Sequence, residues 1–147
     1  VEGFFSGYRN TVLAEGEYIK AVSIGRAEFN GFRRYFKNSK RTMDDISTVM
    51  GAFYIDVQSC QVRAARIAYG GLAATPIRIK AVEAYLQGKA VGEIDIESAT
   101  ALLKSAINPL SDVRASADYR SEVAVNMLEI ALREQAGEVI PSVTALI

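Results

Sequence analysis

Residues 49–68, VMGAFYIDVQSCQVRAARIA, decide the fold, because they read as two β-strands joined by a tight turn. β-branched and aromatic residues are frequent in Val49–Val57 and Gln61–Ala68, as is typical of strands. Gln58–Cys60 has the right length for a hairpin connection between them. Because side chains alternate along a strand, one face of the first strand is expected to carry Val49, Gly51, Phe53, Ile55 and Val57.

Two further strands are predicted on the N-terminal side of this hairpin. Tyr18–Ile24 and Phe32–Lys37 are rich in aromatic and β-branched residues, and Asn30-Gly31 is a turn signal before the second of them. The hairpin is therefore expected to belong to a sheet of three to four strands.

Three helices are predicted after the strands. Each opens on a residue that accepts hydrogen bonds from the first helical turn, namely Thr75, Asp95 or Ser116, and each carries an apolar stripe at helical spacing. Pro76 suits the first helical position after Thr75. The predicted helices span 75–88, 95–108 and 116–137.

Strands followed by helices predict an α+β domain: a small antiparallel sheet of three to four strands followed by a three-helix layer. The domain is expected to cover residues 1–136, with 137–147 as a tail or linker. Because the chain opens on Val1 rather than Met, within a segment that looks structured, it is expected to be a fragment or a processed chain.

The composition excludes several classes of function. The 147 residues suffice for one domain, and 17 basic against 17 acidic residues give a net charge of zero. That balance argues against a dedicated nucleic-acid binder. The sequence has no apolar run long enough to span a membrane and no signal-peptide pattern. Neither nucleic acid nor a membrane is therefore an expected partner.

The chain has no histidine, and Cys60 is its single cysteine. Histidine-dependent nucleophile systems and imidazole metal sites are thereby excluded. The chain alone holds no disulfide, cysteine-ligated zinc or iron–sulfur cluster, and a reducing compartment, the cytoplasm, is inferred. It also lacks the GxGxxG and GxxxxGK phosphate loops.

Residues 36–47, FKNSKRTMDDIS, concentrate charge directly after a predicted strand. One interpretation is a solvated turn whose charges pair with one another. In the other, Lys37 directs its ammonium group at an anionic or electron-rich ligand, where it would stabilise developing negative charge. Lys40 or Arg41 and Asp44 would then balance the local potential.

Two more stretches lie where regular structure ends. In 68–76, AYGGLAATP, adjacent glycines permit unusual backbone conformations, and we interpret the stretch as a strand-to-helix connection. In 110–120, LSDVRASADYR, Asp112 and Arg114 form an ion pair in one interpretation. In the other, Arg114 and Arg120 face a partner subunit. The sequence does not favour either.

In this order and spacing, the stretches resemble the C-terminal part of the FAD-binding subunit or domain of molybdenum hydroxylases, most closely of the xanthine dehydrogenase type. The resemblance runs from about Phe4 to Arg133, and the opening FFSGYR favours the xanthine type. It is carried by FFSGYRNTVLAEGEYI at 4–19, FKNSKRTMDDIS at 36–47, ARIAYGGLAATP at 65–76 and LSDVRASADYR at 110–120.

The resemblance implies a domain that closes over FAD held chiefly by two preceding domains. The position matching Ile19 packs on the flavin, Lys37 touches the FAD, and residues 38–48 lie alongside the isoalloxazine. Asp44 is implied to lie near the ring where NAD approaches, and Arg41 is counted with it as cofactor-binding. No residue of the chain is expected to be catalytic or to bind a metal.

The resemblance further implies a complex that hydroxylates a purine at molybdenum and passes electrons through iron–sulfur clusters to FAD and NAD. The expected partners are the preceding FAD-binding domains, an iron–sulfur domain and a molybdopterin subunit, in a hetero-oligomer whose isolated C-terminal chain is inactive. Two alternatives stay open. One is the flavoprotein of another molybdenum hydroxylase, of the carbon monoxide dehydrogenase or aldehyde oxidoreductase type, and the other is a non-catalytic module that docks subunits.

Overall fold

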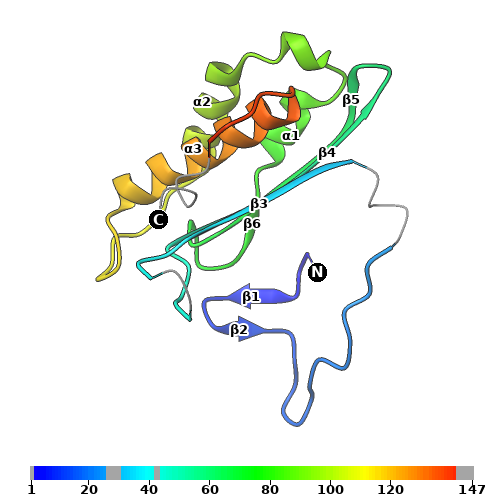
Figure 1. The fold of residues 1–147 in the computed structure, drawn as a ribbon. Helices are drawn as coiled ribbons and strands as arrows, with labels where there is room; N and C mark the ends of the chain where they lie inside the picture. Colours follow the sequence, from blue (N-terminus) through cyan, green and yellow to red (C-terminus); the bar gives the residue numbers. More distant parts are fainter. Residues whose placement is uncertain (1, 26–30, 42–43, 142–147) are drawn as a thin grey trace.

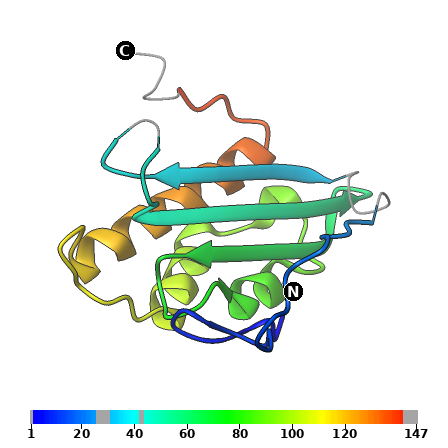
Figure 2. The same ribbon diagram turned by 90° about the horizontal axis from the view of Figure 1, so that it is seen from below.

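The computed structural model describes residues 2–25, 31–41 and 44–141 of the chain. In this part, four antiparallel strands form a sheet in the order β3-β4-β5-β6, and three α-helices cover one face of it (Figure 1, Figure 2). The strands are β3 (Phe32–Asn38), β4 (Val49–Gln58), β5 (Gln61–Gly70) and β6 (Ile77–Arg78). The helices are α1 (Lys80–Leu86), α2 (Ile96–Ala106) and α3 (Ala117–Gln135). The predicted α+β class is confirmed.

The turn of the β4–β5 hairpin has two residues rather than the three of the predicted connection, because Gln58 still belongs to β4. Gln58 pairs with Gln61, and Ser59 and Cys60 between them have φ of 52° and 62°. Positive φ at both central residues is the requirement of a type I′ turn, whose twist matches that of the flanking strands. The hairpin is thus confirmed, although neither turn residue is the glycine or asparagine that such turns favour.

The helix-facing side of the sheet forms the core. β4 buries Phe53 and Ile55 as predicted, but Val57 is exposed and Asp56 is buried. The reason is a register shift after Asp56, where the pairing steps from Asp56–Ala64 to Val57–Val62. A bulge of this kind turns the following side chains to the other face. Helices α1 and α3 pack on the sheet, and α2 packs against both of them.

The predicted start of the first helix at Thr75 and Pro76 is wrong. Ile77–Arg78 instead pairs with β5, and the Ile79 backbone N–H donates to Ile67 O at 2.9 Å, so α1 begins only at Lys80. The unsatisfied edge of β5 competes with the helix for these backbone groups. The other two caps are confirmed, because the Asp95 carboxylate accepts from the first turn of α2 and Ser116 Oγ from the Tyr119 N–H of α3.

The predicted strand Tyr18–Ile24 is also wrong for this structure. The N-terminal segment forms a two-stranded ribbon of β1 (Phe5–Gly7) and β2 (Asn10–Thr11), and residues 18–24 belong to no strand. This segment lies on the side of the main sheet away from the helices (Figure 1), at the edge formed by β6 (Figure 2). Within the described residues, no helix is long and apolar enough to cross a membrane.

The turn chemistry generates a stability prediction. Replacing Ser59 by Asn together with Cys60→Gly should raise the free energy of unfolding by about 1 kcal/mol, because both residues adopt positive φ at little cost. Urea denaturation measures the change as a higher midpoint at an unchanged slope. Cys60→Val, which places a β-branched residue at positive φ, should lower the midpoint. If both variants unfold at the wild-type midpoint, the turn assignment is wrong.

Candidate functional site

Lys37 lies near the end of β3 on the face of the sheet away from the helices. Burial alternates along β3, so that Phe36 packs toward the core while Tyr35 and Lys37 are exposed. Its neighbour across the sheet is Met50 of β4, which is also exposed. Among the described residues, Lys37 has no ion pair or hydrogen-bonding partner for its ammonium group. The lysine is therefore available to a ligand or partner.

The loop that follows carries Arg41 and Asp44 with exposed side chains. Asp44 has φ of 53°, a left-handed conformation that Asp tolerates better than most residues. Thr42 and Met43 lie outside the described residues. Lys37, Arg41 and Asp44 are thus brought to one end of the sheet, by β3 and by the loop after it.

The interpretation in which the charges of this loop pair with one another is wrong for the described residues. No ion pair there joins a basic residue of the loop to Asp44 or Asp45. Lys40 Nζ instead donates to Val113 O at 3.3 Å, and the Asp45 carboxylate accepts from the Ile46 N–H at 2.9 Å. The charges are held separately, so they stay available to something outside the described chain.

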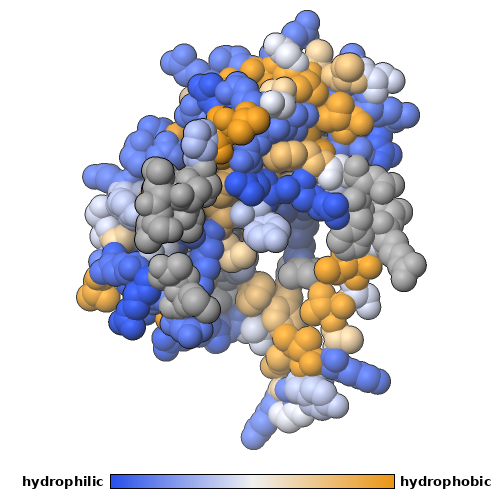
Figure 3. Space-filling view, viewed as in Figure 1, coloured by the Kyte–Doolittle hydropathy of each residue, from blue (hydrophilic) through white to orange (hydrophobic). Residues whose placement is uncertain are grey.

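Ile19 lies apart from this group. Its side chain is 55% exposed and borders an apolar hollow of about 830 Å³ in the N-terminal segment. No described contact joins it to Lys37, Arg41 or Asp44. Figure 3 shows apolar side chains gathered over this segment. The structure therefore unites three of the four predicted cofactor-binding residues and leaves the fourth separate.

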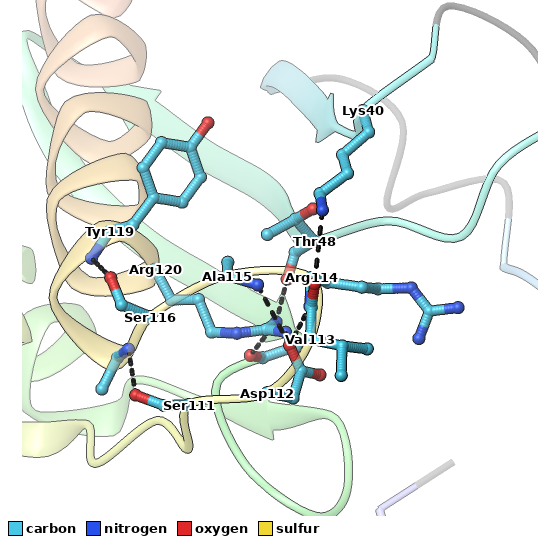
Figure 4. A network of polar contacts seen from close by, with 12 residues as sticks. Lys40, Thr48, Ser111, Asp112, Val113, Arg114, Ala115, Ser116, Tyr119 and Arg120 are labelled. Carbon is cyan, nitrogen blue, oxygen red and sulfur yellow. Dashed lines mark hydrogen bonds and ion pairs between the residues drawn. The ribbon is translucent and has the colours of Figure 1, made fainter.

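Arg120 joins the three polar stretches of the sequence (Figure 4). Its side chain is only 7% exposed, and its guanidinium donates to Thr48 O, to Gly71 O at 3.0 Å and to Asp112 Oδ1 at 2.9 Å. Thr48 follows the charged loop, and Gly71 follows β5. One buried cation thus fixes the loop, the glycine corner and the turn before α3 relative to one another.

Gly71 is required at this corner for two reasons. Its φ is 83°, and a Cβ there would lie 2.3 Å from Thr48 O. Residues 68–76 are therefore more than a strand-to-helix connection. A larger residue at position 71 would push the backbone away from the Thr48 carbonyl, to which Arg120 donates.

The structure contradicts the predicted ion pair of Asp112 with Arg114 and the predicted contact of Arg120 with a partner, whereas a partner contact of the exposed Arg114 stays a prediction. The Asp112 carboxylate pairs with Arg120, and from Arg114 it accepts only the backbone N–H, at 2.9 Å. The Arg114 side chain points away from the carboxylate (Figure 4), and Arg120 is buried rather than turned toward a partner. The sequence held a signal for this, because Arg120 shares the helical stripe of the buried residues Ala124, Met127, Leu128 and Ala131.

The environment of Asp112 lowers its pKa to about 2. The largest cause is the hydrogen bond from the Arg114 backbone N–H, followed by those from Arg120 and from the Ala115 N–H. The carboxylate is therefore ionised at all ordinary pH values, and it neutralises the buried guanidinium.

Comparison with known proteins identifies the family of this chain. The family model of the CO dehydrogenase flavoprotein C-terminal domain matches residues 34–135. The chain belongs to this family. The predicted resemblance to the C-terminal part of molybdenum hydroxylase flavoproteins is thereby confirmed.

Individual relatives of this flavoprotein domain agree with the family. Glyceraldehyde dehydrogenase medium chain of Sulfolobus acidocaldarius is 28% identical over 90% of this chain and 47% of its own length. Xanthine dehydrogenase of Emericella nidulans is 35% identical over 58% of this chain and 6% of its own length. Carbon monoxide dehydrogenase of Hydrogenophaga pseudoflava, in a form that lacks the Mo-pyranopterin moiety, matches at a TM-score of 0.76 and 29% identity. That match covers 92% of this chain and 47% of the other, so the chain spans about half the length of several relatives.

The Arg120 junction generates a stability prediction. Arg120→Met should lower the free energy of unfolding by about 3 kcal/mol, because two backbone carbonyls and a carboxylate lose a buried charged donor. Urea denaturation at neutral pH measures the loss. Arg114→Met is the matched control, because that side chain is exposed and should cost almost nothing. Equal losses in the two variants would show that the junction does not stabilise the fold.

The lowered pKa of Asp112 predicts a pH dependence. Its folded value of about 2 lies below the usual 3.8, so its stabilisation is complete above the usual value and disappears as the pH falls through about 2. Wild-type stability should therefore fall more steeply than that of Asp112→Asn between about pH 5 and pH 2. Thermal unfolding midpoints across this range test the difference. Parallel profiles would show that Asp112 gains nothing from its ionised form.

Proposed function

We propose that this chain is the C-terminal domain of the FAD-containing part of a molybdenum hydroxylase, where it closes over a flavin held mainly by other segments. The observation that carries the proposal is the separated charge of Lys37, Arg41 and Asp44, in a domain of a flavoprotein family. Exposed charges are well solvated and cost a domain little, and those without a partner in the described residues remain available to a cofactor edge.

The described residues fit part of a flavin site. Lys37 offers an ammonium group without a partner among the described residues, on the same exposed face of β3 as Tyr35, and Ile19 offers an exposed apolar side chain. The sequence has no glycine-rich phosphate loop, so the pyrophosphate and ribose contacts would come from elsewhere. When bound, FAD would take electrons delivered by iron–sulfur clusters and pass them to the final acceptor.

In the proposed assembly, Lys37 binds the flavin, Arg41 and Asp44 set the charge beside the ring, and Ile19 packs on it. The iron–sulfur and molybdopterin groups would belong to other segments of a cytoplasmic hetero-oligomer. Relatives described as medium chains support several subunits. We also propose that the domain covers residues 1–136, with 137–147 as a tail or linker, which agrees with the end of α3 at Gln135.

Our sharper proposal is a xanthine dehydrogenase-like enzyme that uses NAD as acceptor. The matches to xanthine dehydrogenases of Emericella nidulans and Calliphora vicina, 35% and 34% identical, support it. The second candidate is a carbon monoxide or aldehyde dehydrogenase, because medium chains of that kind match 88–90% of this chain. A non-catalytic docking module, the third reading, would carry no flavin contact at all.

The flavin contact predicts the effect of Lys37→Ala in the natural enzyme complex. Loss of one charge-assisted contact should weaken FAD binding by about 10- to 100-fold, measured as the flavin retained after gel filtration. Asp44→Ala should keep the flavin but change the rate of NAD reduction. Lys104→Ala is the control, because that lysine pairs with Glu122 on the helix layer.

Three results would contradict, in turn, the proposed site, the proposed function and the proposed substrate. Unchanged flavin content and NAD reduction in both variants would refute the site. A complex that lacks flavin would refute the function. A flavin-containing complex that oxidises an aldehyde or carbon monoxide, but no purine, would favour the second candidate.

A further inference from the structure

A small pocket lies between the charged loop and the turn before α3. Asn38, Lys40, Arg114 and Tyr119 are among the residues that line it, and its volume is about 170 Å³. Pockets that take drug-sized ligands measure about 300 Å³ or more. This pocket therefore suits the end of one side chain or a small ion, and it is too small for a whole nucleotide.

The pocket is positively charged. Lys40 and Arg114 are the charged residues in its lining, and no acidic residue of the described chain lines it. The carboxylate of Asp112, in the same turn as Arg114, already pairs with Arg120 at 2.9 Å. Among the described residues, neither Lys40 nor Arg114 forms an ion pair. The chemistry that complements the pocket is thus an anion.

Hydrogen-bond donors remain available at the pocket. Lys40 Nζ donates to Val113 O at 3.3 Å, which leaves its other N–H groups without an acceptor in the described chain. Tyr119 Oη accepts from Asn38 Nδ2 at 3.2 Å, but it lies 3.5 Å from Asn38 Oδ1, beyond the usual length for a hydroxyl donor. The phenol proton is therefore available to a closer acceptor. A carboxylate, which only accepts hydrogen bonds, matches these donors.

The turn that carries Arg114 is fixed in place. Asp112 Oδ1 accepts from the N–H groups of Arg114, at 2.9 Å, and of Ala115, at 3.1 Å. The Asp112 N–H donates to Ala115 O at 3.0 Å, and Arg120 holds the carboxylate (Figure 4). Val113 and Arg114, at the centre of this turn, are therefore presented to solvent on a backbone that needs little further ordering on binding.

Apolar side chains accompany the cations. Val113 is 94% exposed and Leu110 is 76% exposed, and both belong to the segment that precedes α3. Tyr119, in the first turn of α3, is 49% exposed. Tyrosine and arginine are enriched at protein–protein interfaces, where a few such side chains carry most of the binding free energy. This composition favours a protein partner over a free ion, because exposed apolar side chains contribute nothing to the binding of an ion.

The N-terminal segment does not supply this partner. It lies at the β6 edge of the sheet, whereas Asn38, which lines the pocket, ends β3 at the opposite edge (Figure 2). The other subunits of the proposed hetero-oligomer are the remaining candidates.

We propose that Lys40, Val113, Arg114 and Tyr119 form a docking pocket for an aspartate or glutamate side chain of another subunit of the enzyme complex. The carboxylate accepts hydrogen bonds from the two cations and the phenol, and Val113 packs against apolar side chains around it. This inference rests on the multi-subunit assembly of the proposed function and not on the flavin contact.

Carbodiimide coupling in the natural enzyme complex tests the contact, because this reagent joins an amine directly to a carboxylate that touches it. Peptide mass spectrometry should find Lys40 joined to an aspartate or glutamate of another subunit. Lys104 is the internal control, since its Nζ lies 2.9 Å from Glu122 Oε1 of the same chain. The proposal is overturned if the Lys104–Glu122 link is found while Lys40 is joined only to carboxylates of its own chain, or to none.

Two further readings of the same sample separate the alternatives. Inorganic phosphate that protects Lys40 from acetylation, in a complex without the cross-link, would show that the pocket binds a free anion and would overturn the proposal. Flavin content is measured in parallel. The cross-link without flavin would keep the docking pocket and refute the proposed flavin function, whereas flavin without the cross-link would do the reverse.

Arg114→Met tests the contribution of the pocket to association, because the side chain is exposed and its loss should leave the urea midpoint unchanged. It should raise the dissociation constant of the bound subunit at least about 10-fold, measured by analytical ultracentrifugation. The matched control is Arg133→Met, which removes an arginine that pairs with Glu129 of its own helix at 2.9 Å. Equal dissociation constants for the two variants would overturn the proposal.

Discussion

The structure depends on a buried guanidinium that must find acceptors. Arg120 lies on the core side of α3, and a charge removed from water is tolerated only where hydrogen bonds and an opposite charge replace the water. The acceptors come from three places distant in sequence, at Thr48, Gly71 and Asp112. The hydrogen bonds of Nη1 and Nη2 therefore fix how the start of β4, the end of β5 and the start of α3 meet, although Nε is buried without a partner.

That junction also determines what the charged loop can do. The loop leaves β3 after Lys37 and returns at Thr48, whose N–H donates to Asn38 O and whose carbonyl Arg120 holds. Lys40 Nζ donates to Val113 O, in the turn that the Asp112 carboxylate stabilises by accepting backbone hydrogen bonds. Both ends of the loop are thus held by hydrogen bonds, while no ion pair joins its charges to one another within the described residues. Held ends limit where the charges of the loop can lie, which reduces the conformational entropy lost if they bind a ligand.

The features predicted correctly are those that depend on residues close together in the sequence. The β4–β5 hairpin, the Asp95 and Ser116 caps and the end of the last helix follow from neighbouring residues, and all of them are present. The errors occur where contacts with residues distant in the sequence override the local pattern. The edge of β5 takes Ile77 from the helix that Pro76 predicted, and the helical stripe makes Arg120 a core residue rather than a partner contact. The location of Lys37 on an exposed face follows from alternation, but its lack of an ion pair with any described residue depends on contacts that no local pattern contains.

The incorrect prediction of a strand at Tyr18–Ile24 differs from these errors. No other backbone pairing within the described chain takes the place of the expected strand pairing. At β6 the neighbouring strand β5 pairs with the residues, whereas residues 18–24 belong to no strand and have no backbone hydrogen bond within the described chain. The strand pattern of residues 18–24 is therefore left without a backbone partner among the described residues. Arg120, in contrast, fixes the charged loop through acceptors that lie far apart in the sequence. A pattern becomes regular structure only where such a partner is present, which is why the same kind of sequence signal succeeds at β4 and fails at residues 18–24.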